Sequence, residues 1–298
     1  MLLFAEEAEG GPLIVQFINK LFGEQLCEFE KAHTKPLWDS FFSLFHTNAE
    51  AVFGKYTPEN AIPWYTVMFV IACLLTIFVI YLFKGKLSGD DPSNTQLTLE
   101  ASYVYLSDLA SKVIGSHGAK YFPVMATFAV LILISNLMGQ FPMFMSPTAS
   151  VNVTFALSVT SFLYYTSVGI RENGLIGYLG HFAGPKLPIM IAIFVTPLIF
   201  CVELISNLIR PFTLGIRLFA NMFADEKIFH EITNLAPPFT QFAIPLILTL
   251  LGVFVALVQT LVFTLLSMIY VSEVSHPPHD DHDYTHETHE PDAAVAHA

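Results

Sequence analysis

The sequence predicts an all-α, polytopic membrane protein that crosses the bilayer about five times. Of its 298 residues, 54% are hydrophobic and only 13% are charged, whereas soluble domains carry about 25% charged residues. Apolar stretches long enough for the ~30 Å hydrocarbon core recur along the chain. The last two stretches are too long to stand upright in that core, which predicts two long tilted helices.

Several classes of function are excluded by composition and by missing motifs. The formal net charge of −12 argues against nucleic-acid binding. The chain has no phosphate-binding Walker loop, no H-E-x-x-H, no G-x-S-x-G and no dinucleotide fingerprint. Its cysteines, Cys27, Cys73 and Cys201, are widely spaced and show no metal or disulfide pattern. We therefore expect no metal and no cofactor.

Three segments differ in composition. Residues 1–62 are mostly polar, and within them Ile14–Phe29 is expected to form a surface helix. Residues 63–273 contain the apolar stretches and form the predicted transmembrane domain. Residues 274–298 are rich in His and acids, and we expect a disordered tail, because they lack the apolar residues that a core requires. Metal binding by the histidines of this tail is the alternative.

The first span is predicted at Trp64–Phe83, with aromatic residues at both ends. Lys84 and Lys86 follow at once, so the positive-inside rule places this end in the cytoplasm and the N-terminus outside. The next stretch, Leu97–Ile114, is too polar to span and is expected to lie on the cytoplasmic surface as an amphipathic helix.

Two further spans are predicted at Tyr121–Phe141 and Val151–Ile170. The uncharged residues 142–150 between them are expected to form a short external loop. Arg171 returns the chain to the inside, and a Gly-rich loop is expected from there to Lys186.

The last two apolar stretches are Leu187–Thr233 and Gln241–Ser272, with Ala236-Pro237-Pro238 between them. At ~1.5 Å per residue they would measure about 70 Å and 48 Å, so we expect a tilted or nearly in-plane hairpin that packs on a partner. Five crossings place the C-terminus inside. The loops assigned to the cytoplasm contain Lys84, Lys86, Lys112, Lys120, Arg171 and Lys186, and the short external loops contain no Lys or Arg.

The first long stretch contains Arg210, Arg217, Asn221, Asp225 and Glu226. A charge at the bilayer centre costs at least ~2.5–3.5 kcal/mol, so such residues usually mark a functional site. Arg210 and Arg217 lie two helical turns apart and share a face, and Asn221 lies one turn beyond Arg217.

The segment Leu214-Gly-Ile-Arg-Leu-Phe-Ala-Asn-Met-Phe-Ala224 closely resembles the signature of the a subunit of F-type rotary ATP synthases. Asn136-Leu-Met-Gly-Gln-Phe-Pro142 and Val151-Asn-Val-Thr154 fit the external-loop region of that family, and Gln259 in Leu257-Val-Gln-Thr-Leu-Val-Phe263 fits its last helix. The resemblance covers about residues 60–273.

The resemblance implies a five-crossing subunit whose last two helices form a hairpin against a rotating ring of c subunits. It further implies two offset half-channels for protons, and a place beside the b-subunit stalk and the rest of the synthase in the cell inner membrane. The chain would be a component of that enzyme and no enzyme by itself. The essential arginine of the family falls on Arg217 and not on Arg210.

The residues expected on the proton path are Asn136, Asn152, Glu203, Asn221, Asp225, Glu226 and Gln259. Further candidates are Ser206, Arg210, His230 and Gly252. We expect Asn221 to orient the guanidinium of Arg217, and Gln259 to hydrogen-bond Arg217 across the hairpin.

The chain departs from the family at two positions. Many members have a small residue where Asp225 stands and a His where Gly252 stands. We interpret this as a titratable group that has moved across the hairpin, with Gly252 leaving room for it.

Structural alternatives remain open for several residues. Arg210 would merely extend its charge to the cytoplasmic boundary. Asp225 and Glu226 would pair with Lys227 at an aqueous edge. Asn221 and Gln259 would form ordinary helix–helix hydrogen bonds, worth ~0.6 kcal/mol on average.

Two other classes of function compete with the stator subunit. An independent channel or carrier would transport ions without a ring, although the chain has no internal repeat of the kind found in many carriers. A structural scaffold would tolerate substitution of Arg217. The sequence leaves H⁺ and Na⁺ coupling open.

We predict that the tail is dispensable for ATP synthesis. Truncation after Ser275 should leave assembly and the rate of ATP synthesis within about twofold of wild type, because a solvated terminus contributes little. Synthesis in membrane vesicles and immunoblotting of the complex test this expectation. A truncated protein that fails to assemble, or a wild-type activity that requires added zinc, would show that the tail has a role.

Overall fold

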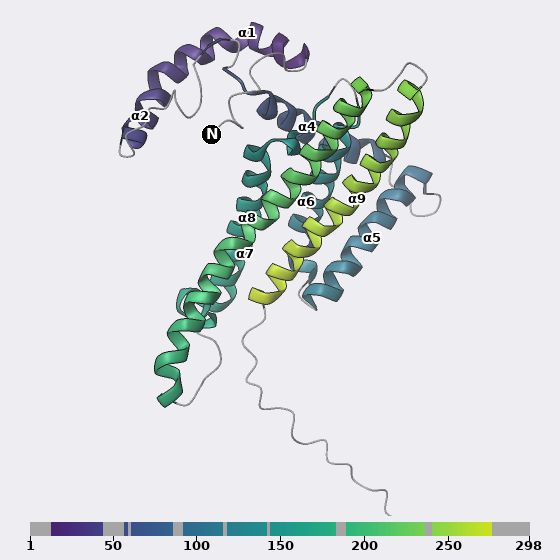
Figure 1. Cartoon of the computed structure of the whole chain (residues 1–298). Coiled ribbons are helices and arrows are strands. Elements are labelled where there is room, and N and C mark those ends of the chain that lie inside the picture. The colour runs from purple at the N-terminus through teal and green to yellow at the C-terminus, as the bar shows by residue number, and fades with distance from the viewer. Residues whose placement is uncertain are drawn as a thin grey trace, which may run out of the picture.

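The computed structural model describes residues 13–43, 57–58, 61–85, 92–115, 118–141, 144–182, 189–235 and 240–275. Within these ranges every regular element is helical, which confirms the all-α prediction (Figure 1). The N-terminal part contains α1 (Leu13–Phe29), a π-helical turn (Glu30–Thr34) and α2 (Lys35–Ser43). The bundle contains α4 (Trp64–Lys84), α5 (Asn94–Ile114), α6 (Gly118–Met138), the 3₁₀ turn η3 (Pro147–Ala149), α7 (Val151–His181), α8 (Ile189–Leu235) and α9 (Thr240–Ser275).

Five helices of the described chain are long and apolar enough to cross a membrane, as predicted. The candidate spans are Trp64–Lys84, Gly118–Met138, Val151–Tyr178, Phe194–Phe229 and Leu246–Ser275. α5 is not among them, in agreement with the amphipathic surface helix expected there. It packs along α6 and α9.

The ends of the shorter helices follow from local chemistry. Pro63 precedes α4 in an extended conformation, and Gly85 ends that helix at φ +50°, a conformation that favours glycine. At the start of α5 the Ser93 hydroxyl accepts a hydrogen bond from the Gln96 backbone N–H at 3.3 Å, as an N-cap does.

The expected Gly-rich loop after Ile170 is in part wrong, because the helix continues to His181. Only Gly174 interrupts it, at φ +70° and ψ 165°. Beyond this kink the chain carries Tyr178 and Phe182, which are both buried. Tyr178 packs so closely on Gly169 that a Cβ at Gly169 would lie 2.6 Å from its ring. Burial of these aromatic side chains outweighs the low helix propensity of glycine.

The expected short external loop is folded into the bundle rather than exposed. Residues 146–150 are buried. The Ser146 hydroxyl donates to the Ser135 carbonyl at 3.0 Å, and the Thr148 hydroxyl donates to Asn136 Oδ1 at 2.6 Å. Small hydroxyl side chains can be buried because these partners satisfy them.

The two long helices form the expected hairpin. α8 runs through Pro197 and Pro211 for 47 residues, and α9 extends for 36. The two helices contact one another and are tilted relative to the rest of the bundle (Figure 1). α6 and α7 cover their inner side, with Phe128 packed on Phe263 at 5.9 Å between ring centroids. The Pro-Pro turn, Lys186 and the tail from residue 276 lie outside the described residues.

Candidate functional site on the α8–α9 hairpin

Arg217 lies on the side of α8 that faces away from the bundle. Leu214 and Leu218, on either side of it in sequence, are buried in the core, whereas Arg217 itself is exposed. Its exposed neighbour Ile216 is apolar and 53% exposed. Among the residues that the structure describes, no carboxylate pairs with Arg217. The hairpin therefore presents an uncompensated cation on an open and largely apolar face.

Asn221 and Gln259 were both expected to contact Arg217, but they form a hydrogen bond with one another instead. Asn221 Nδ2 donates to Gln259 Oε1 at 2.7 Å. Gln259 is only 3% exposed, so its oxygen is reached from within the hairpin, while the guanidinium of Arg217 stays on the open side. The remaining donor of this residue, Gln259 Nε2, has no partner in the described part of the chain.

Asp225 lies where α8, α9 and the end of α6 meet. Gln140 Nε2 donates to Asp225 Oδ2 at 2.8 Å. A Cβ at Gly252 would lie 2.7 Å from the same carboxylate oxygen and would also collide with the Gln140 amide. The contact between Asp225 and Gly252 across the hairpin thus agrees with the interpretation that glycine leaves room for the acid.

Lys227, the alternative partner considered for Asp225, lies elsewhere. Its Nζ is 5.5 Å from the centre of the Phe223 ring, and the hydrogen-bond partner of Asp225 is Gln140. Gln140 was missed by the sequence analysis. The signal was present, since Gln140 belongs to the Asn136–Pro142 motif, but nothing in the spacing indicated that it reaches α8.

A buried polar cluster lies on α6 next to this site. Asn136 is 1% exposed and Ser135 is fully buried. Asn136 Nδ2 and Ser135 Oγ lack a hydrogen-bond partner among the described residues. Buried polar groups of this kind usually bind water. Asn152, on the first turn of α7, is exposed instead and is not part of this cluster.

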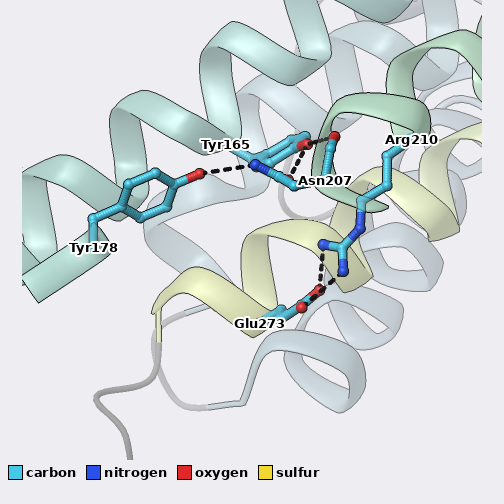
Figure 2. A network of polar contacts seen from close by, with 5 residues as sticks. All are labelled: Tyr165, Tyr178, Asn207, Arg210 and Glu273. Carbon is cyan, nitrogen blue, oxygen red and sulfur yellow. Dashed lines mark hydrogen bonds and ion pairs between the residues drawn. The ribbon is translucent and has the colours of Figure 1, made fainter. Parts of the chain in front are cut away.

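Arg210 forms a partly buried ion pair with Glu273, so its charge has a partner within the protein. Its Nη1 and Nη2 donate to the two carboxylate oxygens of Glu273 at 2.6 and 2.9 Å (Figure 2). The guanidinium carbon also lies 5.0 Å from the centre of the Tyr270 ring. The sequence did not indicate this role for Glu273, which lies just past the predicted helix end at Ser272.

The same end of the bundle is closed by a second set of contacts, also drawn in Figure 2. The Tyr165 hydroxyl donates to Asn207 Oδ1 at 2.8 Å, and Asn207 Nδ2 donates to the Tyr178 hydroxyl at 3.4 Å. Tyr165 and Tyr178 are both buried. This end is therefore tightly packed with aromatic rings, in contrast to the unsatisfied polar groups near Asp225.

The remaining predicted residues lie along α8. Ser206 and Arg210 line a shallow depression of about 480 Å³ on its outer side, together with Val202, Ile205, Ile209 and Thr213. Glu203 and Glu226 are half-buried. The side chain of His230 is outside the described residues.

The fold and these contacts define a polytopic helical membrane protein that carries an unpaired arginine, interacting amides and a buried-edge carboxylate on one helical hairpin, within the part of the chain that the structure describes. The sequence profile of the ATP synthase A chain matches residues 65–272, and the chain belongs to that family. It is thus an Fo subunit of the multisubunit ATP synthase.

Similar proteins from three bacteria have the same family assignment. ATP synthase subunit a of Solibacter usitatus is 37% identical over 205 residues, which cover 69% of this chain and 83% of the relative. The subunit a of Geobacter sulfurreducens is 38% identical over 202 residues, or 68% of this chain and 82% of the relative. That of Bdellovibrio bacteriovorus is 41% identical over 166 residues, or 56% and 68%.

We predict that loss of the Arg210–Glu273 pair destabilises the hairpin. Glu273→Gln leaves the Arg210 charge uncompensated, which should cost about 1–3 kcal/mol, below the ~3–5 kcal/mol of a fully buried pair because both side chains retain some solvent contact. The midpoint of denaturant-induced unfolding in detergent measures this loss.

Two variants serve as controls for that measurement. The double variant Arg210→Gln/Glu273→Gln should have a higher denaturant midpoint than Glu273→Gln alone, because no unpaired charge remains. Asp108→Asn breaks the exposed Lys112–Asp108 pair and should change stability by only ~0.5 kcal/mol or less. Equal midpoints for Glu273→Gln and wild type would contradict the prediction.

Proposed function

We propose that this chain conducts protons to and from a ring of c subunits, and that Arg217 controls the protonation of the ring carboxylates. The observation that carries the proposal is the exposed, uncompensated guanidinium of Arg217 on the open face of α8. A cation in such a place is costly in the membrane unless an anion reaches it. A ring that brings one carboxylate after another supplies that anion.

Arginine suits this role for two reasons. An opposite charge within ~4–6 Å lowers the pKa of a carboxyl group by about 1–3 units, so each ring carboxyl gives up its proton as it approaches. Arginine itself stays protonated and cannot pass a proton on. Protons are therefore blocked from moving directly between the two half-channels.

The structure supports Arg217 over Arg210 as the controlling charge. Arg210 is neutralised by the two-point contact with Glu273, whereas Arg217 has no such partner in the described chain. A neutralised guanidinium holds a passing carboxylate far less strongly than a free one.

The outer half-channel is proposed to run through the polar cluster around Asp225. The cluster supplies carboxylates and amides from Asp225, Glu226, Gln140 and Asn136. Asn136 Nδ2 has no partner among the described residues and can bind water. The Asn221–Gln259 pair lies between this cluster and Arg217, since Asn221 is one turn from each of them along α8.

The second half-channel is proposed to follow the depression at Ser206 and Arg210, near Glu203. The aromatic contacts of Tyr165 and Tyr178 close the bundle interior at that end, which leaves the outer surface of α8 as the route. In the cell inner membrane this end would face the cytoplasm, with the N-terminus outside. The b-subunit stalk would hold the chain against the turning ring.

We predict that Arg217→Gln and Arg217→Ala abolish proton-driven ATP synthesis in the assembled complex. Arg217→Lys should support little ATP synthesis, because an ammonium group is strongly hydrated and lacks the planar fork of arginine. Synthesis in membrane vesicles is the measurement, with immunoblotting to show that the complex is present.

Arg171→Gln is the matched control for Arg217. It removes an exposed arginine of α7 that lies outside the proposed proton path, and should retain most of the activity. Normal ATP synthesis by the Arg217→Gln variant would indicate that the chain is a structural scaffold. Proton conduction by the chain alone, without a ring, would indicate an independent channel.

We predict that Asp225→Asn slows proton flux about tenfold or more, since it removes a titratable group from the path. Gly252→His alone should also impair flux, because its side chain collides with Gln140 and Asp225. The double variant Asp225→Gly/Gly252→His makes room for the imidazole, and its proton flux should be higher than that of either single variant. Proton flux into vesicles is measured from pH 6 to 9; an Asp225→Asn variant that matches wild type throughout would exclude this route.

A further inference from the structure

Helix α1 is fixed at the level where α4 begins. Asn19 Nδ2 donates to the Ile62 carbonyl at 3.1 Å, and the Ile62 N–H donates to Asn19 Oδ1 at 3.0 Å. Val15 packs in one buried cluster with Trp64 and Met68, which lie in the first two turns of a candidate membrane span. In Figure 1, α1 lies across the end of the bundle rather than along it. α1 is therefore level with the first turns of this candidate span.

The side chains of α1 fall on three sides of the helix. Residues that recur every four positions face the protein and are buried: Val15, Asn19, Gly23 and Cys27. A second set with the same spacing is charged and exposed: Lys20, Glu24 and Glu28. A third set is apolar but exposed, with 57%, 53%, 37% and 57% of each side chain accessible: Leu21, Phe22, Leu26 and Phe29.

At 3.6 residues per turn, the centres of the protein, charged and apolar sides point about 100–140° apart. Two residues depart from this division: Phe17, which is 64% exposed, falls between Glu24 and Glu28, and the exposed Gln25 falls within the apolar side. A helix between protein and water alone needs only two sides. The third side therefore requires another environment.

The rotation of α1 about its axis is fixed by close packing. A Cβ at Gly23 would collide with the backbone carbonyl of Pro58, so the helix backbone approaches this segment as closely as glycine allows. Together with the two hydrogen bonds of Asn19, this contact determines which side faces outward.

We propose that Leu21, Phe22, Leu26 and Phe29 insert into the interfacial layer of the bilayer, on the side of the membrane where α4 begins. An interfacial helix places its apolar side at the boundary between headgroups and acyl chains and its polar side in water. The exposed charges Lys20, Glu24 and Glu28 sum to −1, so binding relies on apolar contact and not on attraction to anionic lipids. α1 lies outside residues 65–272 that match the family, and the inference does not depend on the proposed proton path.

Spin labels on adjacent positions of the assembled complex test this placement. Single cysteines are introduced at Phe22 and Leu26, and, as matched controls, at Glu24 and Glu28. Cys27, Cys73 and Cys201 are replaced by serine or alanine, and other reactive cysteines of the complex are removed. The labelled complex is reconstituted into phosphatidylcholine vesicles. Collision rates with oxygen, which concentrates in hydrocarbon, and with a water-soluble nickel chelate are measured.

We expect the ratio of oxygen to nickel collisions to be at least about threefold higher at positions 22 and 26 than at 24 and 28, because only the former face the acyl boundary. Equal nickel access at positions 22 and 24 would overturn the proposal in favour of a water-exposed helix. Low access of both reagents at position 22 would overturn it in favour of a protein partner. ATP hydrolysis by each labelled complex shows that it remains assembled.

Discussion

The antiparallel contact between α8 and α9 is the interaction on which the rest of the structure depends. Helices gain little hydrophobic energy from association within lipid, so polar contacts and close packing must hold them. Here the Arg210–Glu273 pair joins the two helices toward the end of α9, and the Asn221–Gln259 bond joins them near the middle. At Gly252, α9 approaches Asp225 so closely that an added Cβ would lie 2.7 Å from its carboxylate oxygen. These contacts set the register and leave Arg217 outside.

The two ends of the bundle have opposite character because of this register. Near Asp225, the Asn136 amide and the Ser135 hydroxyl are buried without a partner among the described residues, and such groups favour bound water. Near Tyr165, the Tyr165 hydroxyl and Asn207 satisfy one another and the Tyr270 ring packs beside them, whereas the Thr166 hydroxyl has no partner in the described chain. These interiors are consistent with the two proposed proton routes, one inside the bundle and one on its surface.

Much of the fold could be predicted from hydropathy and charge. The candidate spans and the unusual length of α8 were evident, because apolar runs and proline turns are local signals. The continuation of α7 past Gly174 and the burial of residues 146–150 were missed, since both arise from contacts with distant helices. At the site, Arg217 and the opposition of Asp225 to Gly252 were predicted. Gln140 and Glu273 were not, because their partners lie 85 and 63 residues away.

The packing at Gly252 also constrains how this part of the chain can change over evolutionary time. The ends of the Asp225 and Gln140 side chains occupy the space that a side chain at position 252 would need, so a histidine acquired there first would displace both of them. An acid that became small first would leave no titratable group at either position. On the proposed proton path, a lineage that exchanges one arrangement for the other therefore passes through an ancestor with slower proton flux, unless both codons change together or Glu226 carries the protons.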